Sequence, residues 1–217
     1  MSLKSLTISD ELHEYVIAHT GPRDALIREL TEETRAVLPD RAQMQIAPEQ
    51  GPFLSLLVKL VGARYAVEVG TFTGLSSISI ARALPADGRL VCFDISEEYT
   101  SIARRYWDRA GLADRIELRI GPAAEGLAAL PADRGIDFAF IDADKTGYPT
   151  YWQELVPRMR PGGVIAVDNV LRGGRVLDPQ GPDDRAIAEF NDLVVADERV
   201  DVAMLPLADG VTVARVR

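Results

Sequence analysis

The sequence predicts an α/β protein with a doubly wound sheet of seven strands, most of them parallel. From about residue 64 onward, short and almost continuously apolar runs alternate with amphipathic stretches, as expected for strands joined by crossover helices. Near the end of the chain, two strand-like runs follow each other with only a turn between them. This hairpin indicates one antiparallel strand at the edge of the sheet, and the whole pattern indicates a Rossmann-like fold.

The five parallel strands are predicted from their apolar runs, because a strand that is buried on both faces lacks polar alternation. Between them, apolar residues spaced i, i+3, i+4 predict four helices. Ser96 is a suitable N-cap for the second of these helices, and Gly111 is a suitable stop at its end. The predicted strands are 65–69, 89–94, 115–120, 136–141 and 163–168, and the predicted helices are 75–84, 97–110, 122–130 and 149–159.

The two ends of the chain differ from this pattern. Residues 1–60 have helical but no strand periodicity, so we expect a helical N-terminal extension on an α/β core of 61–217, within one domain of 1–217. After the fifth strand, residues 171–184 are rich in Gly, Pro and Asp and predict a loop before a helix at 184–195. The hairpin strands are expected at 199–205 and 211–216.

Composition narrows the range of partners. The chain of 217 residues has 33 acidic and 24 basic side chains, a formal net charge of −9, and it has no run of Lys and Arg, so we do not expect a nucleic-acid ligand. Its single cysteine, Cys92, cannot form an intramolecular disulfide, and we find no secretory or membrane-spanning apolar stretch. We therefore expect a cytoplasmic protein that does not bind a membrane.

The turn after the first strand predicts a cofactor site, because doubly wound sheets bind ligands at the carboxyl ends of their strands. Residues 70–74 (GTFTG) lack the G-x-G-x-x-G spacing that is typical of dinucleotide sites. The hydroxyl of Ser76, at the start of the next helix, suits a carboxylate such as the amino-acid end of S-adenosylmethionine. Glu68, just before Gly70, could accept a hydrogen bond from the ammonium group or the sugar of such a ligand.

Asp94 ends the second strand, where a carboxylate can hold both hydroxyl groups of an adenosine ribose. The alternative for Asp94 is a helix cap, although Ser96 already provides one. The third strand ends at residues 121–124, whose small side chains, including that of Ala123, could admit an adenine ring. Simple turn chemistry explains the same residues equally well.

Oxygen-bearing side chains at the ends of the fourth and fifth strands predict a cation site. Asp142 follows the fourth strand, and Asp168 and Asn169 end the fifth, so they should meet at one edge of the sheet. Such ligands suit Mg²⁺, with Mn²⁺ or Ca²⁺ as alternatives. Lys145 is close enough to Asp142 to act as the base for a hydroxyl that the cation acidifies. The alternatives are loop capping for the acids and a surface position for Lys145.

At these positions the sequence resembles the cation-dependent class I O-methyltransferases, the group of the catechol and caffeoyl-CoA O-methyltransferases, and especially its small bacterial members. The resemblance covers nearly the whole chain, and the combination of segments is specific although each segment alone is modest. The segments are 44–51 (MQIAPEQG), 67–74 (VEVGTFTG), 141–145 (IDADK), 167–170 (VDNV) and 205–210 (LPLADG).

The resemblance implies that the protein transfers a methyl group from S-adenosylmethionine to one hydroxyl of a catechol-like phenol. It also implies a homodimer, of which the residues give no independent sign. It adds Met44 and Ile46, which would close over the methionine part of the cofactor. The implied residues are Met44, Ile46, Glu68, Gly70, Ser76, Asp94, Ala123 and Asp142 for the cofactor, Asp142, Asp168 and Asn169 for the cation, and Lys145 with Asp142 for catalysis.

Two other functions compete with this interpretation. A nicotinamide-dependent oxidoreductase could use the same kind of sheet, but the chain lacks both G-x-G-x-x-G and a Tyr-x-x-x-Lys pair. A catalytically silent S-adenosylmethionine-binding module would need neither Lys145 nor the three oxygen ligands. The resemblance also has a departure: members that act on coenzyme A esters carry a longer and more basic loop than residues 172–184, which argues against a coenzyme A thioester as acceptor.

Overall fold

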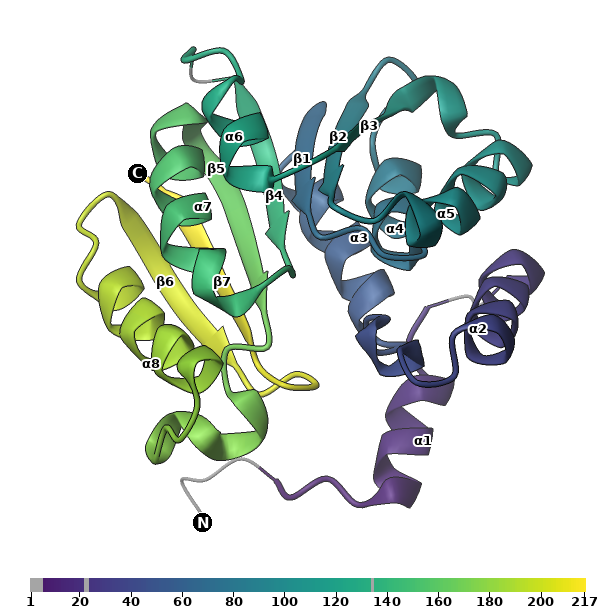
Figure 1. Cartoon of the computed structure of the whole chain (residues 1–217), viewed down its shortest axis with the longest axis horizontal. Helices are drawn as coiled ribbons and strands as arrows, with labels where there is room; N and C mark the ends of the chain where they lie inside the picture. Colours follow the sequence, from purple (N-terminus) through teal and green to yellow (C-terminus); the bar gives the residue numbers. More distant parts are fainter. Residues whose placement is uncertain (1–5, 22–23, 134) are drawn as a thin grey trace.

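The computed structural model describes residues 6–21, 24–133 and 135–217, and its centre is a seven-stranded sheet with helices on both faces (Figure 1). The strand order is β3-β2-β1-β4-β5-β7-β6, so the winding reverses between β1 and β4. β7 runs antiparallel to both of its neighbours, and the other pairs are parallel, which confirms the predicted fold class. The strands are β1 Tyr65–Val69, β2 Arg89–Asp94, β3 Ile116–Ile120, β4 Ile136–Ile141, β5 Met159–Asp168, β6 Val200–Leu205 and β7 Val211–Val216.

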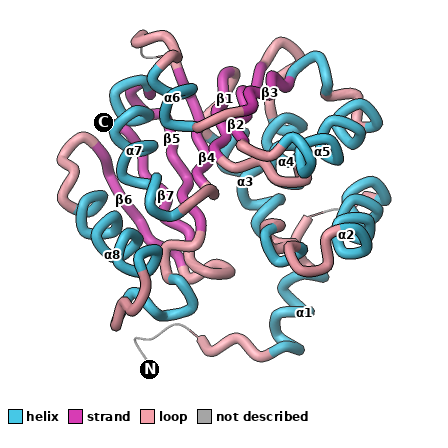
Figure 2. Tube along the Cα trace, in the orientation of Figure 1, coloured by secondary structure: helices cyan, strands magenta, loops and turns pink. Residues whose placement is uncertain are grey.

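Eight α-helices lie in the described part of the chain, and Figure 2 shows them around the strands. Short 3₁₀ turns precede or follow several of them. None of the helices in the described residues is long and apolar enough to cross a membrane. The helices are α1 Asp10–Ala18, α2 Ala25–Val37, α3 Gln50–Leu60, α4 Leu75–Ala83, α5 Glu97–Arg109, α6 Ala123–Ala128, α7 Tyr148–Leu155 and α8 Pro182–Val195.

Alternation along the strands divides the buried side chains into two layers. Val67 and Val69 of β1 pack with apolar residues of α6, α7 and α8, whereas Ala66, just before Val67, packs with apolar residues of α2, α3, α4 and α5. Successive side chains of a strand point to opposite faces, so both faces of the sheet must be apolar. This requirement explains why the strand sequences are almost continuously apolar.

The two largest differences between predicted and observed boundaries lie around Pro157, and both have a local cause. The helix predicted for 149–159 ends at Leu155, because Pro157 interrupts it and a 3₁₀ turn of Val156–Arg158 follows. The fifth strand begins at Met159 rather than at residue 163, since Met159 pairs with Ile136 before a break in the register. The predicted loop after β5 contains a 3₁₀ segment, Arg172–Leu177, and α8 starts slightly early, with Pro182 in its first turn.

The predicted helical N-terminal extension is confirmed for the residues that the structure describes; residues 1–5 and 22–23 lie outside them. α2 and α3 pack against α4 on one face of the sheet. α1 has no buried side chain and lies beyond the end of α3 (Figure 1). Residues of the segment between α2 and α3 line one cavity with residues at the carboxyl ends of the strands, where ligands bind in such folds.

The turn of the C-terminal hairpin supports the loop that follows β5. The backbone carbonyls of Asp209 and Gly210 accept hydrogen bonds from Leu171 and Val170, at 2.9 and 3.2 Å. Gly210 has a φ of +86°, and a Cβ there would lie 2.4 Å from Leu171 Cγ. A glycine is required at this contact, and the contact fixes the backbone next to Asn169.

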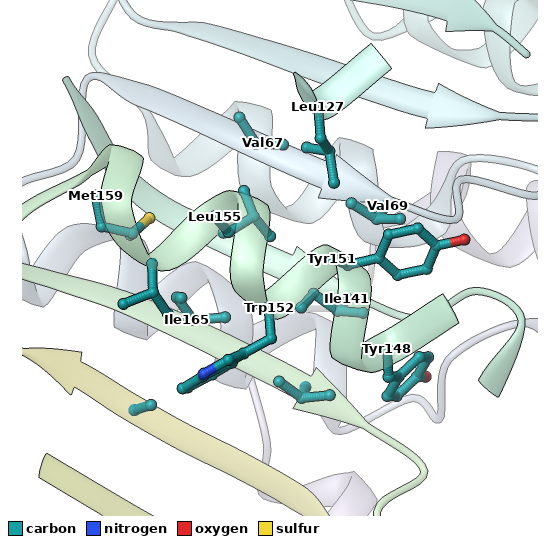
Figure 3. Packing of buried hydrophobic residues seen from close by; sticks show 14 of the residues in the cluster. Val67, Val69, Leu127, Ile141, Tyr148, Tyr151, Trp152, Leu155, Met159 and Ile165 are labelled. Atoms are coloured by element: carbon teal, nitrogen blue, oxygen red, sulfur yellow. The ribbon is translucent and has the colours of Figure 1, made fainter. Parts of the chain in front are cut away.

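The core on the α7 side is centred on Trp152, which Figure 3 shows between α7 and the strands. Its side chain is fully buried, and its ring meets that of Phe190 edge to face, with centroids 5.8 Å apart. The indole Nε1 donates to Asp197 Oδ2 at 2.9 Å. The largest buried side chain thus has both its apolar and its polar requirements met.

We expect the substitution Trp152→Ala to lower the free energy of unfolding by about 3–5 kcal/mol, because it leaves a large cavity. Trp152→Phe should cost less, since it keeps an aromatic ring against Phe190 and loses only part of the buried ring together with the bond to Asp197. Urea unfolding followed by circular dichroism measures both, with Gln153→Ala on the exposed face of α7 as the control. A loss below about 1 kcal/mol for Trp152→Ala would contradict this account of the core.

Candidate active site

The carboxyl edge of the sheet opens into one large cavity of about 1320 Å³. It extends from the glycine-rich turn after β1 to the residues after β4 and β5, and the segment between α2 and α3 closes one side. Every residue that the sequence analysis assigned to the site lines this cavity except Glu68. The lining residues among them are Met44, Ile46, Gly70, Ser76, Asp94, Ala123, Asp142, Lys145, Asp168 and Asn169.

Gly70 brings the two halves of the cavity together. Its φ is +90°, and a Cβ at this position would lie 2.0 Å from the carbonyl oxygen of Asp142. The backbone N–H groups on both sides continue the sheet: Gly70 donates to Phe93 O at 2.9 Å, and Asp142 donates to Val69 O at 2.8 Å. Only a residue without a side chain allows the turn after β1 to lie directly against Asp142.

Asp94 organises the turn after β1. Its Oδ2 accepts hydrogen bonds from the backbone N–H groups of Thr71 and Phe72, at 2.9 and 2.8 Å, and its Oδ1 accepts from Ser96 N at 2.8 Å. The N-cap of α5 is Ser96, whose hydroxyl accepts from Tyr99 N at 3.2 Å, as predicted. Carboxylate oxygens accept more than one hydrogen bond, so Asp94 keeps lone pairs for a ribose, and that role stays a prediction.

Glu68 lies directly behind this turn and is fully buried. Cys92 Sγ donates to its Oε2 at 3.3 Å, and among the described residues its Oε1 has no hydrogen-bond partner. Burial raises the pKa of Glu68 to about 7. An incompletely paired carboxyl group beside the cofactor turn suits a ligand with a positive charge, as S-adenosylmethionine has, but Glu68 does not reach the cavity surface.

The segment over the cavity is attached by a buried polar network that sequence patterns did not reveal. Gln45 Nε2 donates to the hydroxyls of Thr34 in α2 and Thr73 in the turn after β1, at 3.0 and 2.9 Å. The two hydroxyls also bond to each other at 3.0 Å. The network holds Met44, which is 45% exposed, and Ile46, which is buried, over the cofactor side of the cavity.

Pairing of β4 with β5 places the predicted cation ligands together. Ile141 is in register with Val167, so the residues that follow, Asp142 and Asp168, lie side by side at the strand ends, as expected. Burial and the neighbouring Asp142 raise the pKa of Asp168 to about 7. Asn169 follows with a φ of +56°, a left-handed conformation that asparagine tolerates better than most residues.

The described residues contain no group of three His, Cys, Asp or Glu side chains that could hold a metal ion. The predicted set instead consists of two carboxylates and the amide of Asn169. Two neighbouring carboxyl groups, beside an amide that lines the same cavity, fit a small divalent cation, because such a cation prefers oxygen ligands and would offset the negative charge gathered there. The ligand roles of Asp142, Asp168 and Asn169 stay predictions.

Lys145 is fixed from two sides. Its Nζ lies 3.1 Å from Asp142 Oδ1 and donates to Tyr148 Oη at 2.6 Å, and the Tyr148 hydroxyl in turn donates to the carbonyl of Asp168 at 3.1 Å. Tyr148 is fully buried at the start of α7. The Lys-x-x-Tyr spacing at a helix start was the available signal, and sequence analysis did not use it.

A family model described as O-methyltransferase matches residues 18–217. The chain belongs to the O-methyltransferase family. The protein named probable caffeoyl-CoA O-methyltransferase 2 from Dictyostelium discoideum is 41% identical, over 94% of this chain and 90% of that protein. Caffeoyl-CoA O-methyltransferase 2 from Zea mays is 36% identical, over 98% of this chain and 85% of that protein.

Solved structures agree with this family. The O-methyltransferase from Bacillus cereus in complex with SAH is 36% identical and superimposes with a TM-score of 0.87, covering 95% of this chain and 97% of that one. The O-methyltransferase TomG from Streptomyces achromogenes, in complex with SAM, is 32% identical with a TM-score of 0.85, covering 95% and 96%. The protein is therefore an S-adenosylmethionine-dependent O-methyltransferase.

The buried carboxyl group of Glu68 gives this O-methyltransferase a testable pH dependence. The pKa of Glu68 is about 7 in the folded protein and 4.5 for an ordinary glutamate, as in the unfolded chain. Between pH 4.5 and pH 7 the folded protein therefore keeps a proton that the unfolded chain has lost. Glu68 should therefore lower the free energy of unfolding as pH rises from about 4.5 to 7, by about 3 kcal/mol in all.

The variant Glu68→Gln lacks this titration, so its stability relative to the wild type should increase by about 3 kcal/mol between pH 4 and pH 8. Urea unfolding at both pH values, without cofactor and with EDTA present, gives the difference directly, and all other titrating groups are shared by the two proteins. A difference that does not change with pH would show that Glu68 has an ordinary pKa.

Proposed function

We propose that this O-methyltransferase methylates one hydroxyl of a catechol-like, vicinal dihydroxy phenol and depends on a divalent cation, Mg²⁺ or alternatively Mn²⁺ or Ca²⁺. The observation that carries the proposal is a single cavity lined both by the cofactor turn and by Asp142, Asp168 and Asn169. Lys145 Nζ lies 3.1 Å from one of these proposed ligands. A methyl donor and a chelated acceptor could therefore meet in one space.

In this proposal Asp142, Asp168 and Asn169 would hold the cation, which when bound would lower the pKa of an acceptor hydroxyl and fix its oxygen. Tyr148 and Asp142 hold Lys145 Nζ where it can take up the hydroxyl proton, and solvent is the other proton acceptor. The acceptor oxygen then attacks the methyl carbon in line. A carbon–oxygen bond forms as the carbon–sulfur bond breaks, and its electron pair stays on sulfur, giving S-adenosylhomocysteine.

The competing functions are less well supported. Family membership and the absence of a G-x-G-x-x-G turn both disfavour a nicotinamide-dependent oxidoreductase. A silent binding module would not require the buried arrangement of Lys145 with Tyr148 and Asp142. The homodimer, the cytoplasmic location and the absence of nucleic-acid or membrane partners stay predictions.

The direct test is methyl transfer from labelled S-adenosylmethionine to caffeic acid, with Mg²⁺ and again with EDTA. We expect turnover that EDTA removes and that added Mg²⁺ restores. Asp168→Ala should abolish the turnover and leave the affinity for S-adenosylhomocysteine within a few-fold, because it removes a cation ligand and not a cofactor contact. Full activity of this variant in metal-free buffer would refute the cation site.

The loop after β5 predicts a preference for a free phenolic acid over its coenzyme A ester. Arg172 and Arg175 both pair with Asp184, at 3.3 and 3.1 Å, and Arg172 also lies 3.7 Å from Asp183. Guanidinium groups that are already paired with carboxylates attract the phosphates of coenzyme A only weakly.

We therefore expect kcat/KM for caffeic acid to equal or exceed that for caffeoyl-CoA, although several relatives are named for the ester. The measurement compares the two acceptors at saturating S-adenosylmethionine and Mg²⁺, with free coenzyme A added to caffeic acid as the control for nonspecific inhibition. A preference of more than tenfold for the ester would contradict the role assigned to the paired arginines.

A further inference from the structure

The cavity contains a buried amide that the proposed reaction does not use. Gln50 is the first residue of α3, is 3% exposed and lines the same cavity as Asp168. Its Oε1 accepts a hydrogen bond from the backbone N–H of Ala47 at 2.6 Å. Because a backbone N–H must meet an acceptor, this bond identifies the oxygen of the amide and directs Nε2 the other way.

The amide nitrogen is left without a partner. Gln50 Nε2 is buried and, among the described residues, has no acceptor for its hydrogen bonds. A buried unsatisfied donor is unfavourable by about 1–3 kcal/mol, so its retention requires an explanation. Gln50 and Asp168 both line this cavity, and a hydrogen-bonding effect of the Gln50 side chain lowers the pKa of the Asp168 carboxyl group, against the rise that burial causes.

The surroundings of Asp168 show what such a donor would do. Asp168 Oδ1 already accepts from the backbone N–H of Asn169 at 2.7 Å, and the side chain is 2% exposed. Little of the carboxylate is therefore open to solvent, and the unpartnered amide of Gln50, which lines the same cavity, is a side-chain donor that could orient it. A ligand carboxylate that is held by neighbouring donors presents a defined oxygen to a cation.

We propose that Gln50 is a positioning residue of the cation site, which donates from Nε2 to the Asp168 carboxylate and holds it in the orientation that binds the ion. This inference rests on the cation dependence proposed above. It also gives the segment over the cavity a second role, because the Ala47 backbone that anchors Gln50 belongs to the segment that carries Met44 and Ile46. Sequence spacing gives no sign of this contact, since the residues lie far apart in the chain.

The test measures binding of Mn²⁺ alone, by the electron paramagnetic resonance signal of the free ion, without S-adenosylmethionine or acceptor. Gln50→Met has nearly the same shape but lacks both the N–H donor and the oxygen that accepts from Ala47 N–H, and Gln153→Met makes the same change on the exposed face of α7. We expect the first variant to bind Mn²⁺ about 10–100-fold more weakly than the wild type. The second should bind Mn²⁺ like the wild type and should keep its S-adenosylhomocysteine affinity.

The outcomes separate the possible roles. Unchanged Mn²⁺ binding by a folded Gln50→Met protein would overturn the proposal. A loss of cofactor affinity alone would then indicate a purely structural role, and a loss of acceptor affinity alone would indicate a substrate contact. If Gln50→Met does not fold, Gln50→Glu replaces it, because this variant keeps an acceptor for Ala47 N–H and removes the donor. Weaker Mn²⁺ binding by Gln50→Glu at pH 8 would support the proposal, and tighter Mn²⁺ binding would overturn it. A wild type that binds no Mn²⁺ would refute the cation site itself, a separate failure.

Discussion

The close approach of Gly70 to the carbonyl oxygen of Asp142 is the contact on which the site depends. It joins the end of β1, where the cofactor turn begins, to the end of β4, where the proposed cation ligands begin. This is the point at which the winding of the sheet reverses, so the two strand ends diverge into separate turns and leave a cavity between them. A side chain at residue 70 would push the two turns apart and separate methyl donor from acceptor.

Acidic side chains are concentrated at this point, although burial makes their charged forms unfavourable. Glu68 and Asp168 are both buried, and both have a pKa of about 7 because burial disfavours their charged forms. Such groups lower the stability of the protein without ligands at neutral pH and bind positive charge well. A sulfonium cofactor on one side and a divalent cation on the other would remove this cost, which explains why an acidic cavity suits the proposed reaction.

Sequence patterns predicted the strands and the residues at their ends, since both follow from local periodicity and from the register of parallel neighbours. Asp142 and Asp168 could be placed together because β4 and β5 are adjacent. The roles of Gln45 and Gln50 could not be predicted from the sequence, because they depend on residues of other elements that no sequence spacing relates to them. The end of α7 was misjudged for the opposite reason: apolar spacing continued past Pro157, and the local effect of proline was stronger.

The two ends of the chain complete a site that the parallel core only begins. β1, β2 and β4 supply the cofactor turn, Asp94 and Asp142, as a doubly wound sheet does with many ligands. The N-terminal extension adds the segment that holds Gln45 and the buried amide of Gln50, and the turn of the C-terminal hairpin fixes the backbone after β5. The specificity of this enzyme for its acceptor should therefore depend on these additions, because they line the cavity where the core leaves it open.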